Sequence, residues 1–207
     1  MSAKYELTGE RNAEGLYRIR ALRDIPRHGV RAGDLGGWVA GEANLAQDGD
    51  CWVADDAQVF GGARVYGQAR VYDDAQVSGE ARVSDEACVF GGARVYGEAW
   101  VFGKSRVSGG AWVFGESQVF GGAMVSAESH VLSGTGLPSG SWTLFRTRSG
   151  HMLKVGCWMG TTEDLRDLVA GDDWPAARGE QVVQRRPMLS ALADMCDAVI
   201  ATWEPGE

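Results

Sequence analysis

The sequence lacks the features that mark exported, membrane-spanning or disulfide-rich proteins. Its 207 residues contain only 4 cysteines, and none of them stands in a Cys-x-x-Cys pair, so neither a disulfide framework nor a zinc site is expected. No apolar run approaches the roughly 18 residues that a transmembrane helix needs. The chain does not start with the basic and then apolar segment of a signal peptide. We therefore expect a soluble cytoplasmic protein with no membrane partner.

The sequence is also poor in histidine and in positive charge. It has 3 histidines and a formal net charge of −8, and an acidic protein is poorly suited to generic nucleic-acid binding. The glycine pairs at 109–110 and 121–122 do not lead from a strand into a helix, so they are not a phosphate-binding loop. No other catalytic motif is present. We expect no catalytic residues, no metal and no cofactor.

What the sequence does have is a strict repeat. Valines occupy every sixth position from Val53 to Val131 without interruption. A period of six fits neither an α-helix nor a single strand, so it indicates a coil that repeats its own side-chain environment. Up to Val125, the fourth residue after each valine is Ala or Ser, and the second is Gly or Asp except at Ala127. Because Gly and Asp tolerate the φ values of tight corners, each unit predicts a short strand with Ala and Val inward, followed by a corner.

This pattern resembles the left-handed β-helix of hexapeptide-repeat proteins, with units such as Ala-Arg-Val-Tyr-Gly-Gln at residues 63–68. The resemblance covers residues 37–134. It implies a mainly β protein with three units per coil, about five to six coils and a left-handed turn, which is an exception to the usual hand of crossovers. It also implies the homotrimeric assembly that is common in this family.

The N-terminal residues 1–36 predict a cap, because the terminal coil of a solenoid exposes strand edges that need covering. A β-hairpin is expected there, with strands at 5–8 and 16–22. Val39, Leu45 and Cys51 keep the six-residue step, and the phase then slips by two residues before Val53, which indicates a bulge or widened corner at 47–52. The acidic residues around this bulge form either a cation site or a solvated turn. They are Asp48, Asp50, Asp55 and Asp56.

The C-terminal residues 135–207 predict a small ββαα unit. Two strands are expected at 142–148 and 151–158. Thr161 begins an N-cap signal for a first helix that ends before Gly171, and a second helix is expected after Pro187. Because so short a segment cannot build a generous core alone, we expect it to lean on the solenoid or on a neighbouring subunit.

The outer walls of the coil are basic and aromatic. Arginines stand immediately before several valines and aromatic residues immediately after. Clefts between prisms lined in this way would suit a planar anion such as a nucleotide, with rings stacked on its base and guanidinium groups on its phosphate. Alternatively, the same side chains pair with one another and with the corner acids, and only stiffen the coil. The candidate ligand-binding residues are Arg64, Tyr66, Arg70, Tyr72, Arg82, Arg94, Tyr96 and Arg106.

Contiguous aromatic ladders would form a larger apolar patch than a soluble monomer normally exposes. We therefore predict that two of the three walls are subunit interfaces in a closed homotrimer of parallel prisms. The candidate interface residues are Trp100, Phe102, Trp112, Phe114, Phe120 and Leu132.

The resemblance also raises an enzymatic alternative, since many hexapeptide-repeat proteins are acyltransferases that use acyl-CoA and a histidine base. The solenoid holds one histidine, His130, in its last unit, and we interpret it as a surface or interface residue. His28 in the N-terminal cap and His151 at a hairpin corner have no neighbour in sequence that suggests a proton relay. An acyl-CoA-dependent acyltransferase therefore stands as the alternative function.

Longer segments resemble a narrower group of uncharacterised phage and prophage proteins. The matching segments are residues 16–22, 33–39, 48–53 and 156–161. This resemblance implies a phage-encoded protein in the cytoplasm of a bacterial host. It favours a non-enzymatic counter-defence role, either sequestering a small anionic nucleotide-like signal or blocking a host protein. A structural virion or scaffold protein is the third hypothesis.

Overall fold

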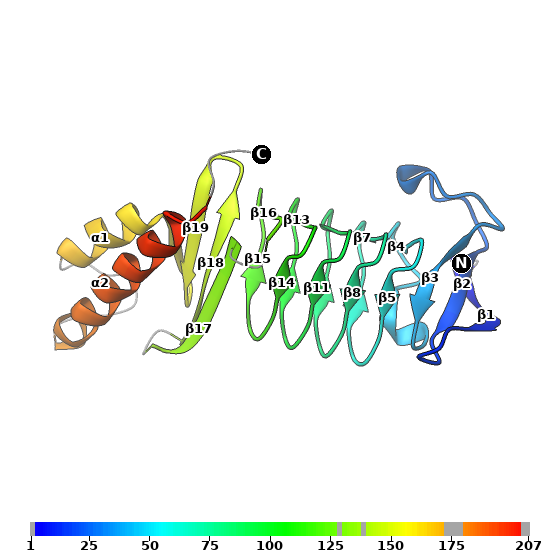
Figure 1. Ribbon diagram of the computed structural model, residues 1–207, viewed down its shortest axis with the longest axis horizontal. Helices are drawn as coiled ribbons and strands as arrows, with labels where there is room; N and C mark the ends of the chain where they lie inside the picture. Colours follow the sequence, from blue (N-terminus) through cyan, green and yellow to red (C-terminus); the bar gives the residue numbers. More distant parts are fainter. Residues whose placement is uncertain (1–2, 128–129, 138–139, 172–179, 204–207) are drawn as a thin grey trace.

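The computed structural model describes residues 3–127, 130–137, 140–171 and 180–203. Three parts follow one another along the long axis of the molecule (Figure 1): an antiparallel cap at the N-terminus, a solenoid of short parallel strands, and a C-terminal sheet that carries two helices. This architecture confirms the predicted mainly β fold built on a parallel β-helix.

The solenoid consists of two-residue strands, each paired in parallel with a strand of the next coil. Val77 pairs with Val95, 18 residues later, so three six-residue units make one coil with three flat walls. Wall 1 contains β5 (Gln58–Val59), β8 (Gln76–Val77), β11 (Arg94–Val95) and β14 (Trp112–Val113). Wall 2 contains β6 (Arg64–Val65), β9 (Arg82–Val83), β12 (Trp100–Val101) and β15 (Gln118–Val119). Wall 3 contains β4 (Trp52–Val53), β7 (Arg70–Val71), β10 (Cys88–Val89), β13 (Arg106–Val107) and β16 (Met124–Val125).

The inward positions of the repeat form one continuous core. From Ala57 to Val125, every repeat valine and every small residue four positions after it is 0–1% exposed. Burying a valine side chain contributes roughly 1.5–3 kcal/mol. The six-residue pattern therefore stabilises a rod that is only one coil wide.

The corners use left-handed backbone, as the Gly and Asp positions predict. Gly97 has a φ of 72°, and a Cβ there would lie 2.9 Å from a backbone nitrogen of the next coil. Asp73 has a φ of 57°, and its Oδ2 accepts a hydrogen bond from the N–H of Gly91 at 3.2 Å. Asp55 and Asp85 make the same contact with the following coil. These corner acids are thus held by backbone N–H groups.

The N-terminal cap is an antiparallel sheet of β1 (Tyr5–Arg11), β2 (Tyr17–Ala21) and β3 (Leu35–Val39). β3 then pairs in parallel with β5, so the cap continues wall 1. The predicted hairpin is confirmed and gains a third strand. Between β2 and β3 the chain makes an excursion that contains the 3₁₀ helix Pro26–His28.

The two-residue phase slip produces the predicted bulge. Leu45 pairs with a residue 20 positions later, whereas Val53 pairs with one 18 positions later, so the extra residues lie between them. The N–H groups of Asp50 and Cys51 both donate to the carbonyl oxygen of Gly67, each at 2.9 Å. Two residues facing one acceptor is the arrangement of a β-bulge.

The C-terminal sheet has four antiparallel strands, two more than the sequence predicts. They are β17 (Val131–Leu137), β18 (Gly140–Thr147), β19 (Gly150–Val155) and β20 (Trp158–Gly160). Val131 continues the six-residue phase, so the pattern assigns it to the solenoid although it begins β17. Neighbouring residues of β18 face opposite ways: Phe145 joins the solenoid core and Leu144 joins the core under the helices. The sheet therefore lies between the last coil and the helices (Figure 1).

The helices are α1 (Thr162–Ala170) and α2 (Glu180–Ile200). The predicted cap of α1 is confirmed, since the Thr161 side chain accepts the N–H of Asp164. The prediction that the second helix starts after Pro187 is wrong, because α2 contains this proline in its interior. Proline is commonest at the first helical position, which made it a misleading start signal. Neither helix has the length and apolar character needed to cross a membrane.

The corner geometry predicts a specific difference between two adjacent aspartates. Asp73→Ala should lower the free energy of unfolding by about 1–2 kcal/mol, because it removes a hydrogen bond and leaves alanine in left-handed backbone. Asp73→Gly should cost less, since glycine adopts this φ freely. Asp74→Ala is the control, because Asp74 is exposed and its φ is not positive. Denaturant unfolding measures all three, and equal losses at positions 73 and 74 would contradict the account.

Candidate functional site

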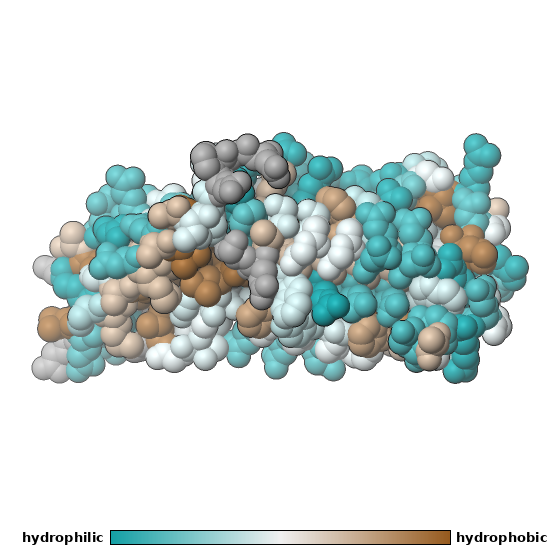
Figure 2. Space-filling model, in the orientation of Figure 1, coloured by the Kyte–Doolittle hydropathy of each residue, from teal (hydrophilic) through white to brown (hydrophobic). Residues whose placement is uncertain are grey.

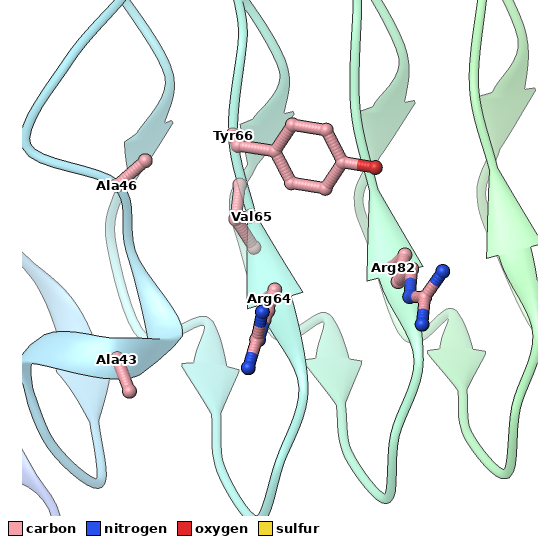
Figure 3. Close-up of a pocket in the computed structure, with 6 residues that line it drawn as sticks. All are labelled: Ala43, Ala46, Arg64, Val65, Tyr66 and Arg82. Carbon is pink, nitrogen blue, oxygen red and sulfur yellow. The ribbon is translucent and has the colours of Figure 1, made fainter.

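A pocket of about 630 Å³ opens on the N-terminal half of wall 2. Three of the predicted ligand-binding residues meet there, Arg64, Tyr66 and Arg82, and Val65 completes the wall. Figure 3 shows the ring of Tyr66 directed toward the next coil, which carries Arg82. Ala43 and Ala46 line the side nearest the cap. The pocket thus combines two guanidinium groups with one aromatic ring.

The pocket exists because the first coil presents no large side chain beside Arg64. At this level the 3₁₀ helix Glu42–Asn44 directly precedes Leu45, the residue that pairs with Val65 of β6. The Asn44 side chain is buried, and its Nδ2 donates to the carbonyl oxygens of Gly61 at 3.0 Å and Ala63 at 2.8 Å. These bonds fix the 3₁₀ helix against β6. Ala43 then stands where a longer residue would fill the pocket.

Arg64 and Arg82 lie side by side on wall 2. They are direct partners in the register of β6 and β9, and both are exposed. Among the residues that the structure describes, neither forms an ion pair with a carboxylate. Like charges placed directly opposite one another are destabilising. An anion bound between them would remove this cost.

Wall 3 brings together a second group of predicted residues. Arg70 and Arg106 flank Cys88 in the strand register. The Arg70 guanidinium lies over the ring of Tyr72, 4.6 Å from its centroid, and Tyr72 stacks on Phe90 at 4.8 Å. This wall therefore shows the ring stacking that stiffens a solenoid without a ligand.

The excursion before β3 contacts wall 3. Arg27 forms an ion pair with Glu86 at 2.7 Å, and Arg23 donates to the carbonyl oxygen of Gly49 at 2.8 Å. Burial lowers the pKa of His28, and the charges of Arg70 and Arg27 lower it further. A neutral His28 among arginines is suited to packing. Part of wall 3 is therefore covered by the segment between β2 and β3.

Wall 1 holds the last two predicted ligand residues. Arg94 lies over the ring of Trp112 at 5.4 Å, and Tyr96 stacks on Phe114 at 5.5 Å. The eight candidates are therefore spread over three walls of one chain. Arg64, Tyr66 and Arg82 of wall 2 line one pocket together.

The predicted interface residues form intramolecular ring stacks. On wall 2, Phe102 lies 4.4 Å from Trp100 and 5.1 Å from Phe120. Of the predicted aromatic set, only Phe114 on wall 1 is strongly exposed, at 41%. Leu132 lies in β17 and packs against the C-terminal core. On the face shown in Figure 2, hydrophobic residues gather over the C-terminal unit, whereas hydrophilic residues dominate the N-terminal end.

His130 is engaged with its own chain. It is 7% exposed; its Nδ1 lies 3.2 Å from the backbone nitrogen of Ser126 and its Nε2 lies 3.1 Å from Arg146. The Trp203 ring packs at its edge, 5.9 Å away. Burial lowers the pKa of His130, and the charge of Arg146 adds to this. The ring is therefore enclosed at the junction of solenoid and C-terminal sheet, so the part of the prediction that makes His130 a surface residue is wrong.

His151 also has a structural role. Its Nε2 accepts the N–H of Thr162 at 2.9 Å, at the start of α1. Asp197 accepts a hydrogen bond from the Thr162 hydroxyl and pairs with Arg166. Burial lowers the pKa of His151. These contacts hold α1 and α2 on the sheet.

The acidic residues around the bulge contact different partners. Asp50 pairs with Arg23 at 3.5 Å and Asp56 with Arg18 at 3.4 Å. Asp55 accepts a backbone N–H. Within the described part of the chain, no group of three or more potential ligands could hold a metal ion.

Sequence reasoning missed Ala43, Asn44 and Ala46, which shape the pocket. The insertion that follows them gives the phase slip as a signal, because it shifts the partners of this coil from 18 to 20 positions later. The periodic pattern identifies Arg64 and Arg82 as partners, but it does not show that the position beside them is empty.

Comparison with known proteins supports a solenoid repeat and leaves the activity open. The family described as "YdcK Beta solenoid repeat" matches residues 63–79, a segment that includes Arg64 and Tyr66. A protein of Escherichia coli (strain K12) named "Uncharacterized acetyltransferase YdcK" is 41% identical over 64 residues. This alignment covers 30% of the present chain and 19% of the relative. The chain thus spans about a fifth of that protein's length.

The charge arrangement of wall 2 predicts a salt-dependent stability change. Arg82→Gln should raise the free energy of unfolding by about 0.5 kcal/mol at low salt, because it removes a like-charge contact with Arg64. The gain should vanish in about 1 M salt, where the screening length is near 3 Å. The control is Arg94→Gln, whose register partners are Gln76 and Trp112, and it should give no gain. Chemical denaturation at low and high salt measures the free energy of unfolding of both variants. A lower value for Arg82→Gln than for the wild-type protein at low salt would contradict the predicted repulsion.

Proposed function

We propose that this chain is a non-enzymatic homotrimeric binding protein for a small planar anion of the nucleotide class. The observation that carries the proposal is the pair Arg64 and Arg82, which lie in register, are exposed and line one pocket with Tyr66. Neither arginine forms an ion pair with a carboxylate in the part of the chain that the structure describes. Two guanidinium groups directly opposite one another on adjacent strands repel each other. A phosphate-bearing ligand gives them a partner.

The pocket assigns a role to each side chain. Arginine donates paired hydrogen bonds to phosphate oxygens in a planar fork. Two arginines on adjacent strands lie about 4.8 Å apart along the wall, which suits one phosphate group or two neighbouring ones. The Tyr66 ring offers a face for base stacking. Ala43 and Ala46 leave room for the rest of the ligand.

A homotrimer would complete this site, because the pocket is open and a neighbouring prism would cover it. Three parallel prisms around an axis place each wall 2 against another subunit. Phe114, the exposed ring of wall 1, is suited to such a contact. In the cytoplasm of a bacterial host, a phage-encoded trimer of this kind would act by sequestering a signalling nucleotide.

Isothermal titration with adenosine diphosphate and with pyrophosphate tests the proposal. The wild-type protein should bind the nucleotide, and Arg64→Glu or Arg82→Glu should weaken binding at least about 100-fold, because each replaces a charge-assisted pair by repulsion. Tyr66→Ala should weaken nucleotide binding but not pyrophosphate binding. Lys104→Glu is the matched control, an exposed corner cation of the same solenoid whose reversal should leave affinity unchanged. Absence of binding to both probes, or equal loss in the Lys104 control, would contradict the proposal.

An acyltransferase is the second candidate, because the Escherichia coli relative bears the name of an acetyltransferase. Hexapeptide-repeat acyltransferases, which this repeat resembles, use a histidine as general base. Here the enclosure of His130 and its contacts with Ser126 and Arg146 argue against this role. We expect no transfer or hydrolysis of acetyl-CoA by the wild-type protein. Thiol release that is abolished in His130→Ala, with the fold intact by circular dichroism, would favour the enzyme instead.

A further inference from the structure

Lys4 is a buried cationic side chain at the N-terminal mouth of the solenoid. Its relative exposure is 0%, and lysines are almost never fully buried unless they are paired. No carboxylate of the described residues forms an ion pair with Lys4. Its partner is therefore of another kind.

That partner is Cys51. The Lys4 Nζ lies 3.0 Å from the Cys51 Sγ and 2.9 Å from the carbonyl oxygen of the same residue. The carbonyl oxygen of Asp48, at 3.4 Å, is the third contact. The backbone nitrogen of Lys4 is also fixed, because it donates to the Oε1 of Gln47 at 2.8 Å. Contacts of both the side chain and the backbone of Lys4 thus hold its amine beside the Cys51 thiol.

The bulge places the sulfur. The doubled hydrogen bond of Asp50 and Cys51 to Gly67 turns the Cys51 side chain inward, where it is 0% exposed and makes no disulfide. Burial raises the pKa of the Cys51 thiol. The sequence pattern alone predicts Cys51 as an ordinary inward-facing position of the repeat. The two-residue insertion places it beside Lys4.

We propose that Lys4 and Cys51 form a site of reversible oxidative cross-linking, in which dioxygen converts the amine and the thiol into a covalent N–O–S bridge. One oxygen atom is inserted between Nζ and Sγ. The lysine ammonium first releases its extra proton to solvent. The second oxygen atom then leaves as water with one hydrogen from nitrogen and one from sulfur, so nitrogen and sulfur together lose four electrons and dioxygen gains them. Two molecules of an added dithiol return the four electrons, which regenerates the amine and the thiol and releases the bridging oxygen as water.

The geometry suits an oxygen-bridged product. Nitrogen and sulfur already touch, and a single inserted atom joins them with little movement. A direct N–S bond would draw both groups out of their contacts with the bulge carbonyls. Local opening of the terminal strand admits a small neutral oxidant.

The bridge would tie the start of the chain to the first coil. It joins residues 47 positions apart, and closing a loop of this size removes conformational freedom from the unfolded chain. The oxidised protein should therefore unfold at a Tm several degrees higher than the reduced protein. The cap over the open edge of the solenoid would then be locked under oxidising conditions and released under reducing ones.

Intact-mass measurement of the wild-type protein before and after exposure to oxygen tests this directly. The oxidised form should be about 14 Da heavier, from one oxygen gained and two hydrogens lost, and a dithiol should reverse the change. Peptide mapping should show the segments around Lys4 and Cys51 joined. Cys88→Ser is the control that should keep the shift, whereas Cys51→Ser and Lys4→Arg should lose it.

Two results would overturn the proposal. One is a wild-type protein whose mass stays unchanged in oxygen, or that gains about 16 Da on Cys51 alone, as a sulfenic acid would. The other is a dithiol-reversible shift of about 14 Da that persists in Lys4→Arg. The mass and the peptide map of the wild-type chain test the bridge even where a variant misfolds.

Discussion

The backbone hydrogen bonds between successive coils are the interaction on which the rest of this structure depends. The N–H of Gln76 donates to the carbonyl oxygen of Ala93, and that of Arg94 to Ala111, both at 2.9 Å. Repeated along three walls, these bonds fix a register in which each residue stacks on the one 18 positions later. Valine then lies on valine and corner on corner. The same register places Arg64 on Arg82, so the chemistry of the walls is a consequence of the stacking.

The features of interest arise where this stacking is interrupted. At the N-terminal end, two inserted residues and the 3₁₀ helix Glu42–Asn44 leave a pocket beside Arg64 and bring Cys51 to Lys4. At the C-terminal end, an antiparallel sheet covers the last coil and encloses His130. In the regular middle, aromatic rings of successive coils stack on one another, as Tyr96 does on Phe114 and Phe102 on Phe120. Function is therefore expected at the irregular ends of the rod rather than along its length.

The regular part of the fold could be predicted from sequence because its cause is local and periodic. The valine phase determines the inward positions, and Gly or Asp two residues later determines the corners. Val131 shows the limit, since it keeps the phase but starts a strand of a different sheet. The pocket could be predicted only in part. The pattern identifies Arg64, Tyr66 and Arg82, but the space beside them depends on how Asn44 anchors a non-periodic turn.

In the proposed function, the wall 2 pocket holds a nucleotide-like anion within a homotrimer. Native mass spectrometry of protein purified gently from cells tests both parts at once, because one spectrum reports subunit number and retained ligand together. The account predicts a mass of three chains plus an excess in the nucleotide range that Arg82→Glu removes. A bare single chain, or the same excess in Arg82→Glu, would contradict it.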